Sequence, residues 1–80
     1  MDTTKAYVLI NAALGMAGGV AEAIKEVDGI KSIENVTREF DAIAMLEAEN
    51  ADVVGKIIVD KIQNISGVIK TVTCLTVSLK

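Results

Sequence analysis

The sequence predicts a single α+β domain over residues 1–80, with two helices on one face of a four-stranded antiparallel sheet. A shift of 38 residues aligns the two halves of the 80-residue chain without a gap. The aligned pairs include Ala6 with Ala44, and Gly29 with Gly67. Each half contains an apolar run, a helical stretch, a glycine and a second strand-like segment. Two β-α-β units in succession predict a ferredoxin-like βαββαβ sandwich.

Four segments have the composition of strands. Residues 5–11 and 42–48 are nearly continuous apolar runs, which is typical of central strands that are covered on both faces. Residues 30–37 and 68–79 mix polar and apolar side chains, as edge strands do. Right-handed crossover connections then place the first and third strands in the middle of the sheet.

Two stretches between these strands have helical periodicity. Val20, Ile24 and Val27 recur at spacings of four and three residues, so they share one face of the first helix. The corresponding stripe of the second helix consists of Val54, Ile58, Ile62 and Ile65. Asn50 is the expected N-cap of the second helix. The two aligned glycines fall where each helix must end and turn into a strand.

The first strand is apolar on both faces. If Val8 and Ile10 face the helices, Tyr7 and Leu9 point to the other side of the sheet. Hydrophobic residues make up 51% of a chain that is too short to cover so much apolar surface by itself. We therefore expect two copies to dimerise through their sheets, face to face, as a dimeric α/β barrel.

The composition argues against several function classes. The chain has no His, and its single thiol, Cys74, is expected to be a packing residue, so we expect no catalytic triad, no metal site and no cofactor. The net charge of -3 argues against direct nucleic-acid binding. The longest apolar stretch, residues 6–21, is interrupted by glycines and is shorter than the ~20 residues of a membrane span. We therefore expect a cytoplasmic protein without a membrane partner.

One polar cluster has functional character, namely the predicted hairpin at residues 37–41. Arg38 can hold a carboxylate and Asp41 can accept an ammonium group, and these are the two ends of a free amino acid. Thr71 and Thr73 share one face of the last strand, so both hydroxyls can reach one ligand. The candidate ligand-binding residues are Thr37, Arg38, Phe40, Asp41, Thr71 and Thr73. A solvated turn and ordinary edge-strand threonines explain the same residues without any ligand.

Residues 6–77 resemble the effector-binding (RAM) domain of the Lrp/AsnC regulators. The resemblance is carried by AYVLIN, by VAEAIKEVDGIKSIENVTREFDAIAMLEAEN and by IIVDKIQNISGVIKTVTCLTV. This family commonly has Thr-Gly-x-Tyr-Asp in the hairpin that corresponds to residues 37–41. Thr37 and Asp41 match that motif, Phe40 replaces the tyrosine, and Arg38 stands where the family has glycine.

The resemblance implies a non-catalytic amino-acid sensor. It implies dimers formed through the sheets, larger rings such as octamers, and a free amino acid bound where dimers meet. Only five residues precede residue 6, where the resemblance begins, so we expect a stand-alone effector domain without a helix-turn-helix. Such a domain is expected to modulate transcription through a full-length Lrp-type regulator.

Two alternatives stay open. The chain can be a structural oligomerisation module with a vestigial pocket, which the replacement of glycine by Arg38 favours. It can also be a small dimeric α/β-barrel enzyme, because fold alone does not set function. Sites of that kind usually use His, Trp or a Tyr–Asn pair, and the first strand offers only Tyr7 and Asn11.

Overall fold

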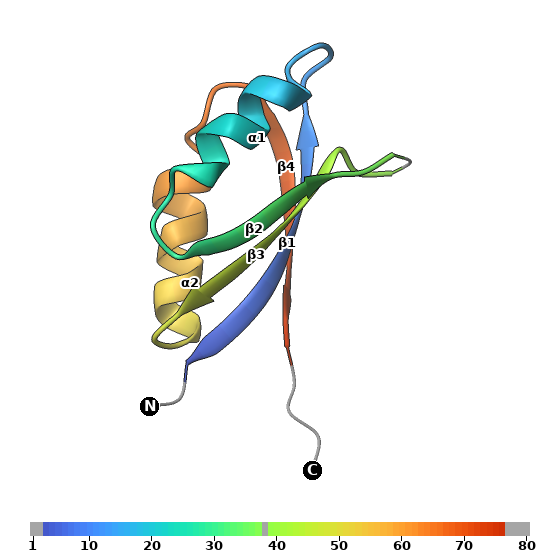
Figure 1. The fold of residues 1–80 in the computed structure, drawn as a ribbon. Coiled ribbons are helices and arrows are strands. Elements are labelled where there is room, and N and C mark those ends of the chain that lie inside the picture. Colours follow the sequence, from blue (N-terminus) through green and yellow to red (C-terminus); the bar gives the residue numbers. More distant parts are fainter. Residues whose placement is uncertain (1–2, 38, 77–80) are drawn as a thin grey trace.

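The chain folds as one antiparallel sheet with helices on one side (Figure 1). The computed structural model describes residues 3–37 and 39–76. The strands are β1 (Thr4–Ala12), β2 (Ile30–Asn35), β3 (Ala42–Ala48) and β4 (Val68–Leu75). The helices are α1 (Ala17–Lys25) and α2 (Ala51–Ile57), and α2 continues into a π-helical turn, η1 (Ile58–Ile62). The spatial order β2-β3-β1-β4 confirms the predicted βαββαβ topology and its central strands.

The register of the sheet determines which side chains share a face. Val8 in β1 lies opposite Ala44 in β3 and Thr73 in β4. Its neighbour Tyr7 lies opposite Met45. Because paired residues of neighbouring strands project to the same side, Val8 and Ala44 point toward the helices and Tyr7 and Met45 point away. The alternation predicted for the first strand is therefore confirmed.

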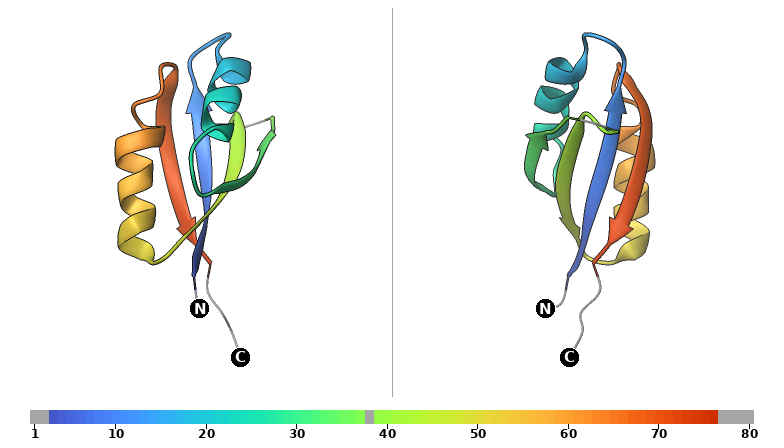
Figure 2. Two further views of the ribbon diagram at one scale, coloured as in Figure 1. Left: turned by 60° about the vertical axis from the view of Figure 1, so that its left-hand side comes forward. Right: turned by 90° about the vertical axis from the view of Figure 1, so that its right-hand side faces the viewer.

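The core lies between the sheet and the two helices, which cover the same face (Figure 2). Its largest buried side chains are Ile10, Ile24, Leu46, Ile62, Val8, Val20 and Val54. Each of these residues belongs to a stripe or strand that the periodicity predicted. The core therefore fills only one side of the sheet, and none of the helices in the described residues covers the other side.

The ends of the helices follow the predicted chemistry. The side-chain oxygen of Asn50 accepts a hydrogen bond from the Val53 N–H at 2.9 Å, so Asn50 is the N-cap of α2. Gly29 and Gly67 both have φ of +99°, a left-handed conformation that favours glycine. A Cβ atom at Gly29 would also lie 2.9 Å from the Leu46 side chain. These two glycines turn each helix into its following strand.

The second helix differs from the regular helix that its apolar spacing predicts. The Gln63 N–H donates to the Ile58 carbonyl at 2.8 Å, which is the five-residue step of a π-helix. Ile58 and Ile62 are both buried at their expected spacing of four, so the isoleucine pattern does not reveal the wider turn. After this turn, the Gln63 amide donates to the Thr71 hydroxyl of β4 at 3.0 Å.

Two strand ends differ from the sequence prediction by more than one residue. β2 ends at Asn35, two residues before the predicted end. At the other edge, the Thr76 N–H donates to the Lys5 carbonyl at 3.0 Å, so pairing with β1 continues just beyond β4. The sequence predicts that the last strand extends to residue 79, but residues 77–79 lie outside the described residues.

Candidate functional site

The sheet has an apolar face that the described part of the chain leaves uncovered (Figure 2, right). We call it the open face, and by register it carries Tyr7, Leu9, Ile43, Met45, Val72 and Cys74. Tyr7 is 47% exposed, and Cys74 opposite it is also exposed. Cys74 therefore lies on the face opposite Thr71 and Thr73, away from the core, and its expected role as a packing residue stays a prediction for the covered face. The predicted two-sided apolar character of the first strand is confirmed.

The hairpin between β2 and β3 is held to the end of β1 through Asp41. The Val36 N–H donates to the Asp41 carbonyl at 3.0 Å, and the Asp41 N–H donates to the Ile10 carbonyl at 2.9 Å. The Asp41 carboxylate oxygen Oδ2 accepts the Ala12 N–H at 2.8 Å. Ala12 lies where the pairing of β1 with β4 shifts register. Asp41 therefore fixes the position of the hairpin with both its backbone and its side chain.

Sequence reasoning assigned the Asp41 carboxylate to a ligand ammonium group. In the structure this half-buried carboxylate already accepts a hydrogen bond from the Ala12 N–H, which lies 29 positions away in the sequence. A charged acceptor for a backbone N–H at a strand end strengthens the local structure. Its first role is thus to hold the hairpin, and through it the neighbouring Phe40.

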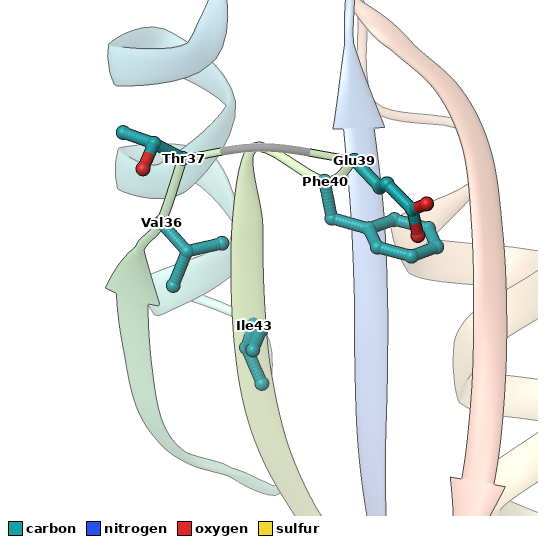
Figure 3. Close-up of a pocket in the computed structure, with 5 residues that line it drawn as sticks. All are labelled: Val36, Thr37, Glu39, Phe40 and Ile43. Carbon is teal, nitrogen blue, oxygen red and sulfur yellow. The ribbon is translucent and has the colours of Figure 1, made fainter.

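The hairpin and the adjoining strand form an open hollow of about 310 Å³ (Figure 3). We call it the hairpin hollow, and it is lined by Val36, Thr37, Glu39, Phe40 and Ile43. Thr37 lies on the β2 side of the hairpin, whereas Glu39 and Phe40 extend together from the other side. Arg38, a predicted ligand-binding residue, lies outside the described residues. A volume of this size is at the lower end for small-molecule sites.

Thr71 and Thr73 lie in a different place. They pair with Ile10 and Val8, whose side chains are buried under the helices, so both hydroxyls are on the helix side of the sheet. There they line a groove of about 420 Å³ between α2 and β4, the α2–β4 groove. Within it, the Thr71 hydroxyl accepts the hydrogen bond from Gln63.

The two parts of the predicted site are therefore separated within one chain. The hairpin hollow includes Ile43 of the open face and adjoins β3, whereas the α2–β4 groove belongs to the opposite face and the opposite edge of the sheet. Sequence reasoning placed Thr71 and Thr73 on a common face but did not say which one. The register with β1 decides this.

Among the lining residues that sequence reasoning did not single out are Glu39 and Ile43 of the hairpin hollow and Gln63 of the α2–β4 groove. Ile43 could have been found from the sequence, because the alternation of side chains along its strand puts it on the open face beside the hairpin. Glu39 was treated as part of a solvated turn. The position of the Gln63 side chain could not be predicted from the sequence, since its direction depends on the π-helical turn before it.

Other kinds of site find little support in the part of the chain that the structure covers. Across residues 3–37 and 39–76, no three His, Cys, Asp or Glu side chains gather where they could hold a metal ion. None of the helices in these ranges is long and apolar enough to cross a membrane. Tyr7 and Asn11, the pair of the enzyme alternative, both lie on the open-face side of β1, and the buried Asn11 side-chain oxygen has no hydrogen-bond partner among the described residues.

The architecture is that of a ferredoxin-like domain with one bare sheet face and a ligand-sized hollow at a hairpin. The family model described as the Lrp/AsnC ligand binding domain matches residues 5–79. The chain belongs to this family, as the resemblance of its sequence indicated. The family is one of regulatory domains, and its related proteins are named transcriptional regulators.

Two relatives come from archaea. An HTH-type transcriptional regulator of Pyrococcus furiosus is 39% identical over 57 residues, which are 71% of this chain and 38% of that protein. A regulator of Pyrococcus abyssi is 37% identical over the same length and coverage. The chain therefore matches well under half of the length of these relatives.

Solved structures share the fold at low sequence identity. A protein from Thermus thermophilus has a TM-score of 0.90 at 23% identity and covers 96% of both chains. Escherichia coli AsnC has a TM-score of 0.88 at 13% identity, covering 95% of this chain and 52% of AsnC. A transcriptional regulator of Neisseria meningitidis, in complex with L-Met, has a TM-score of 0.84 at 13% identity, with coverages of 94% and 50%.

Proposed function

We propose that this chain is a single, non-catalytic, amino-acid-binding domain that acts as a homo-oligomer. Its effector is a free amino acid, and it modulates transcription in the cytoplasm through a full-length Lrp-type regulator. The family assignment, the regulators among its relatives and the L-Met complex of a regulator with this fold support the proposal. Direct nucleic-acid binding is not part of it, because the net charge is -3.

The observation that carries the proposal is the separation of the two candidate hollows. The hairpin residues and the β4 threonines lie on opposite faces and opposite edges of one sheet. A pocket that uses both must therefore combine the hairpin hollow of one copy with the α2–β4 groove of another. A contact between two different surfaces of the same chain is heterologous, and such contacts form a ring where the rotation between copies closes.

In this arrangement two copies form a dimer through their open faces. The pocket forms at a second contact, where the hairpin hollow of one copy meets the α2–β4 groove of another. Apolar side chains such as Tyr7, Leu9 and Met45 gain from being removed from water, which favours sheet-to-sheet pairing. Thr37 and Phe40 then line the pocket from one copy, Asp41 supports them, and Arg38, the residue after Thr37 in the sequence, is proposed to contribute to ligand binding. Thr71 and Thr73 complete the pocket from the neighbouring copy.

Native mass spectrometry of the purified chain, with and without a pool of the twenty amino acids, tests this proposal. We expect an even-numbered ring, such as an octamer, that gains about one amino-acid mass per subunit. The same ring without added mass would contradict amino-acid binding and favour the structural oligomerisation module. A monomer would contradict pairing through the open face.

A further inference from the structure

The charged side chains of the open face are sorted by sign into two halves. We propose that a second copy pairs with this face about a two-fold axis parallel to the strands, so that β4 of each copy lies over β2 of the other. Glu34 of one copy then lies close enough to Lys70 of the other to form an ion pair. This inference rests on the proposed pairing of open faces and deepens it, because it gives the orientation of the partner and the side chains that fix it.

The sheet register assigns four charged side chains of the described strands to the open face. They alternate in phase with Tyr7, and they are Lys5 in β1, Glu34 in β2, Glu47 in β3 and Lys70 in β4. Glu34 also lines a hollow of about 190 Å³ together with Tyr7, as expected for two residues on one face. Lys31 lies in the bulge of β2, where the register assigns it no partner. By register, the half formed by β1 and β4 therefore carries two positive charges, and the half formed by β2 and β3 carries two negative charges.

Two copies of this sheet can meet face to face in two simple ways. With the two-fold axis perpendicular to the strands, each strand lies over the same strand of the other copy. With the axis parallel to the strands, the strand order β2-β3-β1-β4 (Figure 2, right) is reversed, so β4 lies over β2 and β1 lies over β3. This second rotation does not change the position along the strands. Residues that share a register level in one sheet therefore face each other across the contact.

The second arrangement brings opposite charges together. Lys5 and Glu47 share a register level, so each faces the other across the contact. Val72 has the same register level as Glu34. Lys70 is two residues along β4 from Val72, a distance of about 7 Å that a lysine side chain can span. In the first arrangement, by contrast, Lys5, Glu47 and Lys70 face strands whose assigned open-face charges have their own sign.

Glu34 and Lys70 have no access to each other within one copy. Their strands, β2 and β4, are the outer strands of the sheet and are separated by three strand spacings, about 14 Å. Both side chains are exposed in the single chain, and pairing of the sheets removes part of their hydration. A charge left without a partner there costs free energy, whereas an opposite charge across the contact offsets that loss. The charge pattern therefore selects the orientation of the partner.

The neutral side chains fit the same orientation. Cys74 and Ser32 share a register level at the two edges of the sheet, so Cys74 of one copy lies over Ser32 of the other. Ser32 and Tyr7 line the hollow of about 190 Å³, which Cys74 and Val72 of the second copy then cover. The thiol is thereby given a packing position between copies.

Thiol cross-linking of the full chain with bis(maleimido)ethane tests the orientation. Cys74 is the only cysteine, and the proposed orientation puts the two Cys74 thiols at opposite edges of the contact, so the original chain should give little covalent dimer. Ser32→Cys adds a thiol over Cys74 of the other copy and should give at least about fivefold more covalent dimer. Ser32→Cys combined with Cys74→Ser is the matched control and should return to the low level.

An exchange of charges tests the ion pair. Glu34→Lys and Lys70→Glu each place like charges across the contact and should raise the dissociation constant of the dimer about tenfold in sedimentation equilibrium. The two substitutions combined in one chain exchange the signs and should restore the constant to within about threefold of the original. Glu22→Lys, at an exposed position of α1, is the control and should leave the constant unchanged.

The outcomes separate this inference from the function on which it rests. Efficient cross-linking of Cys74 to Cys74 in the original chain, or no recovery when the two charges are exchanged together, would overturn the orientation while the homo-oligomer stands. A monomer of the original chain at micromolar concentration would overturn the proposed pairing of open faces and this inference together.

Discussion

The Asp41 carboxylate accepts the Ala12 N–H at 2.8 Å and thereby joins the β2–β3 hairpin to the end of β1. The bond crosses from one β-α-β half of the chain to the other. It lies at the position where β1 changes register with β4, so the backbone there gains a partner from a side chain. The geometry of the hairpin hollow therefore depends on β1 as well as on the hairpin itself.

Removal of this carboxylate is expected to destabilise the fold. Asp41→Ala leaves the Ala12 N–H without an acceptor and should lower the free energy of unfolding by about 1–3 kcal/mol. Asp41→Asn keeps a side-chain oxygen and should lose less. Urea unfolding followed by circular dichroism measures both values. Equal stability of Asp41→Ala and the original chain would show that the bond contributes nothing.

A side chain at Gly67 is expected to disturb the packing of α1. Gly67 has φ of +99°, and a Cβ atom there would lie 3.0 Å from the side chains of Met16 and Val20. Gly67→Ala should therefore lower the free energy of unfolding by about 1–3 kcal/mol. Gly18→Ala in α1 meets no atom within 4 Å and should leave stability unchanged or raise it by up to about 1 kcal/mol. If the two variants unfold alike, the positive φ of Gly67 is not a constraint.

A charge on the open face is expected to block dimerisation without unfolding the chain. Tyr7 is 47% exposed in the single chain, so Tyr7→Lys does not disturb the core. Pairing of the sheets would bury the new ammonium group without a partner, at a cost of several kcal/mol. Sedimentation equilibrium at micromolar concentration should then give a smaller mass than that of the original oligomer. Lys25→Glu, at an exposed position of α1, is the control and should keep the oligomer. An intact oligomer in Tyr7→Lys would place the interface elsewhere.

Arg38 is expected to contribute to the binding of the effector. Its guanidinium is suited to the α-carboxylate of an amino acid, which Glu39 repels. Arg38→Gln should lower the affinity about tenfold in calorimetry. Tighter binding by Arg38→Gln would instead mean that the arginine, which replaces the family's glycine, narrows the pocket.

Much of the fold could be predicted because local rules determine it. The period-two alternation around Tyr7 and Val8 separated the open face from the core, and the spacing of Val20 and Ile24 gave the buried face of α1. The cap at Asn50 likewise depends only on neighbouring residues. Such features require no knowledge of the rest of the molecule.

The candidate site was less predictable because it depends on contacts between distant residues. The bond from Asp41 to Ala12 needs the antiparallel pairing of β1 with β3, and the face of Thr71 follows only from its register with Ile10. The hydrogen bond of Gln63 to Thr71 further requires a π-helical turn. Composition gave the residue types of the site, but the sheet register determines which of them meet.

The central claim is that the pocket combines the hairpin of one copy with β4 of another, and mixing two defective variants tests it most directly. Phe40→Ala disables the hairpin hollow, whereas the double variant Thr71→Val with Thr73→Val disables the α2–β4 groove. Neither variant alone should bind the tightest amino acid in calorimetry. After the two are unfolded and refolded together, about one quarter of the sites should bind, because each site draws its two parts at random. Mixed oligomers, verified by mass, that recover no binding would contradict a pocket shared between copies.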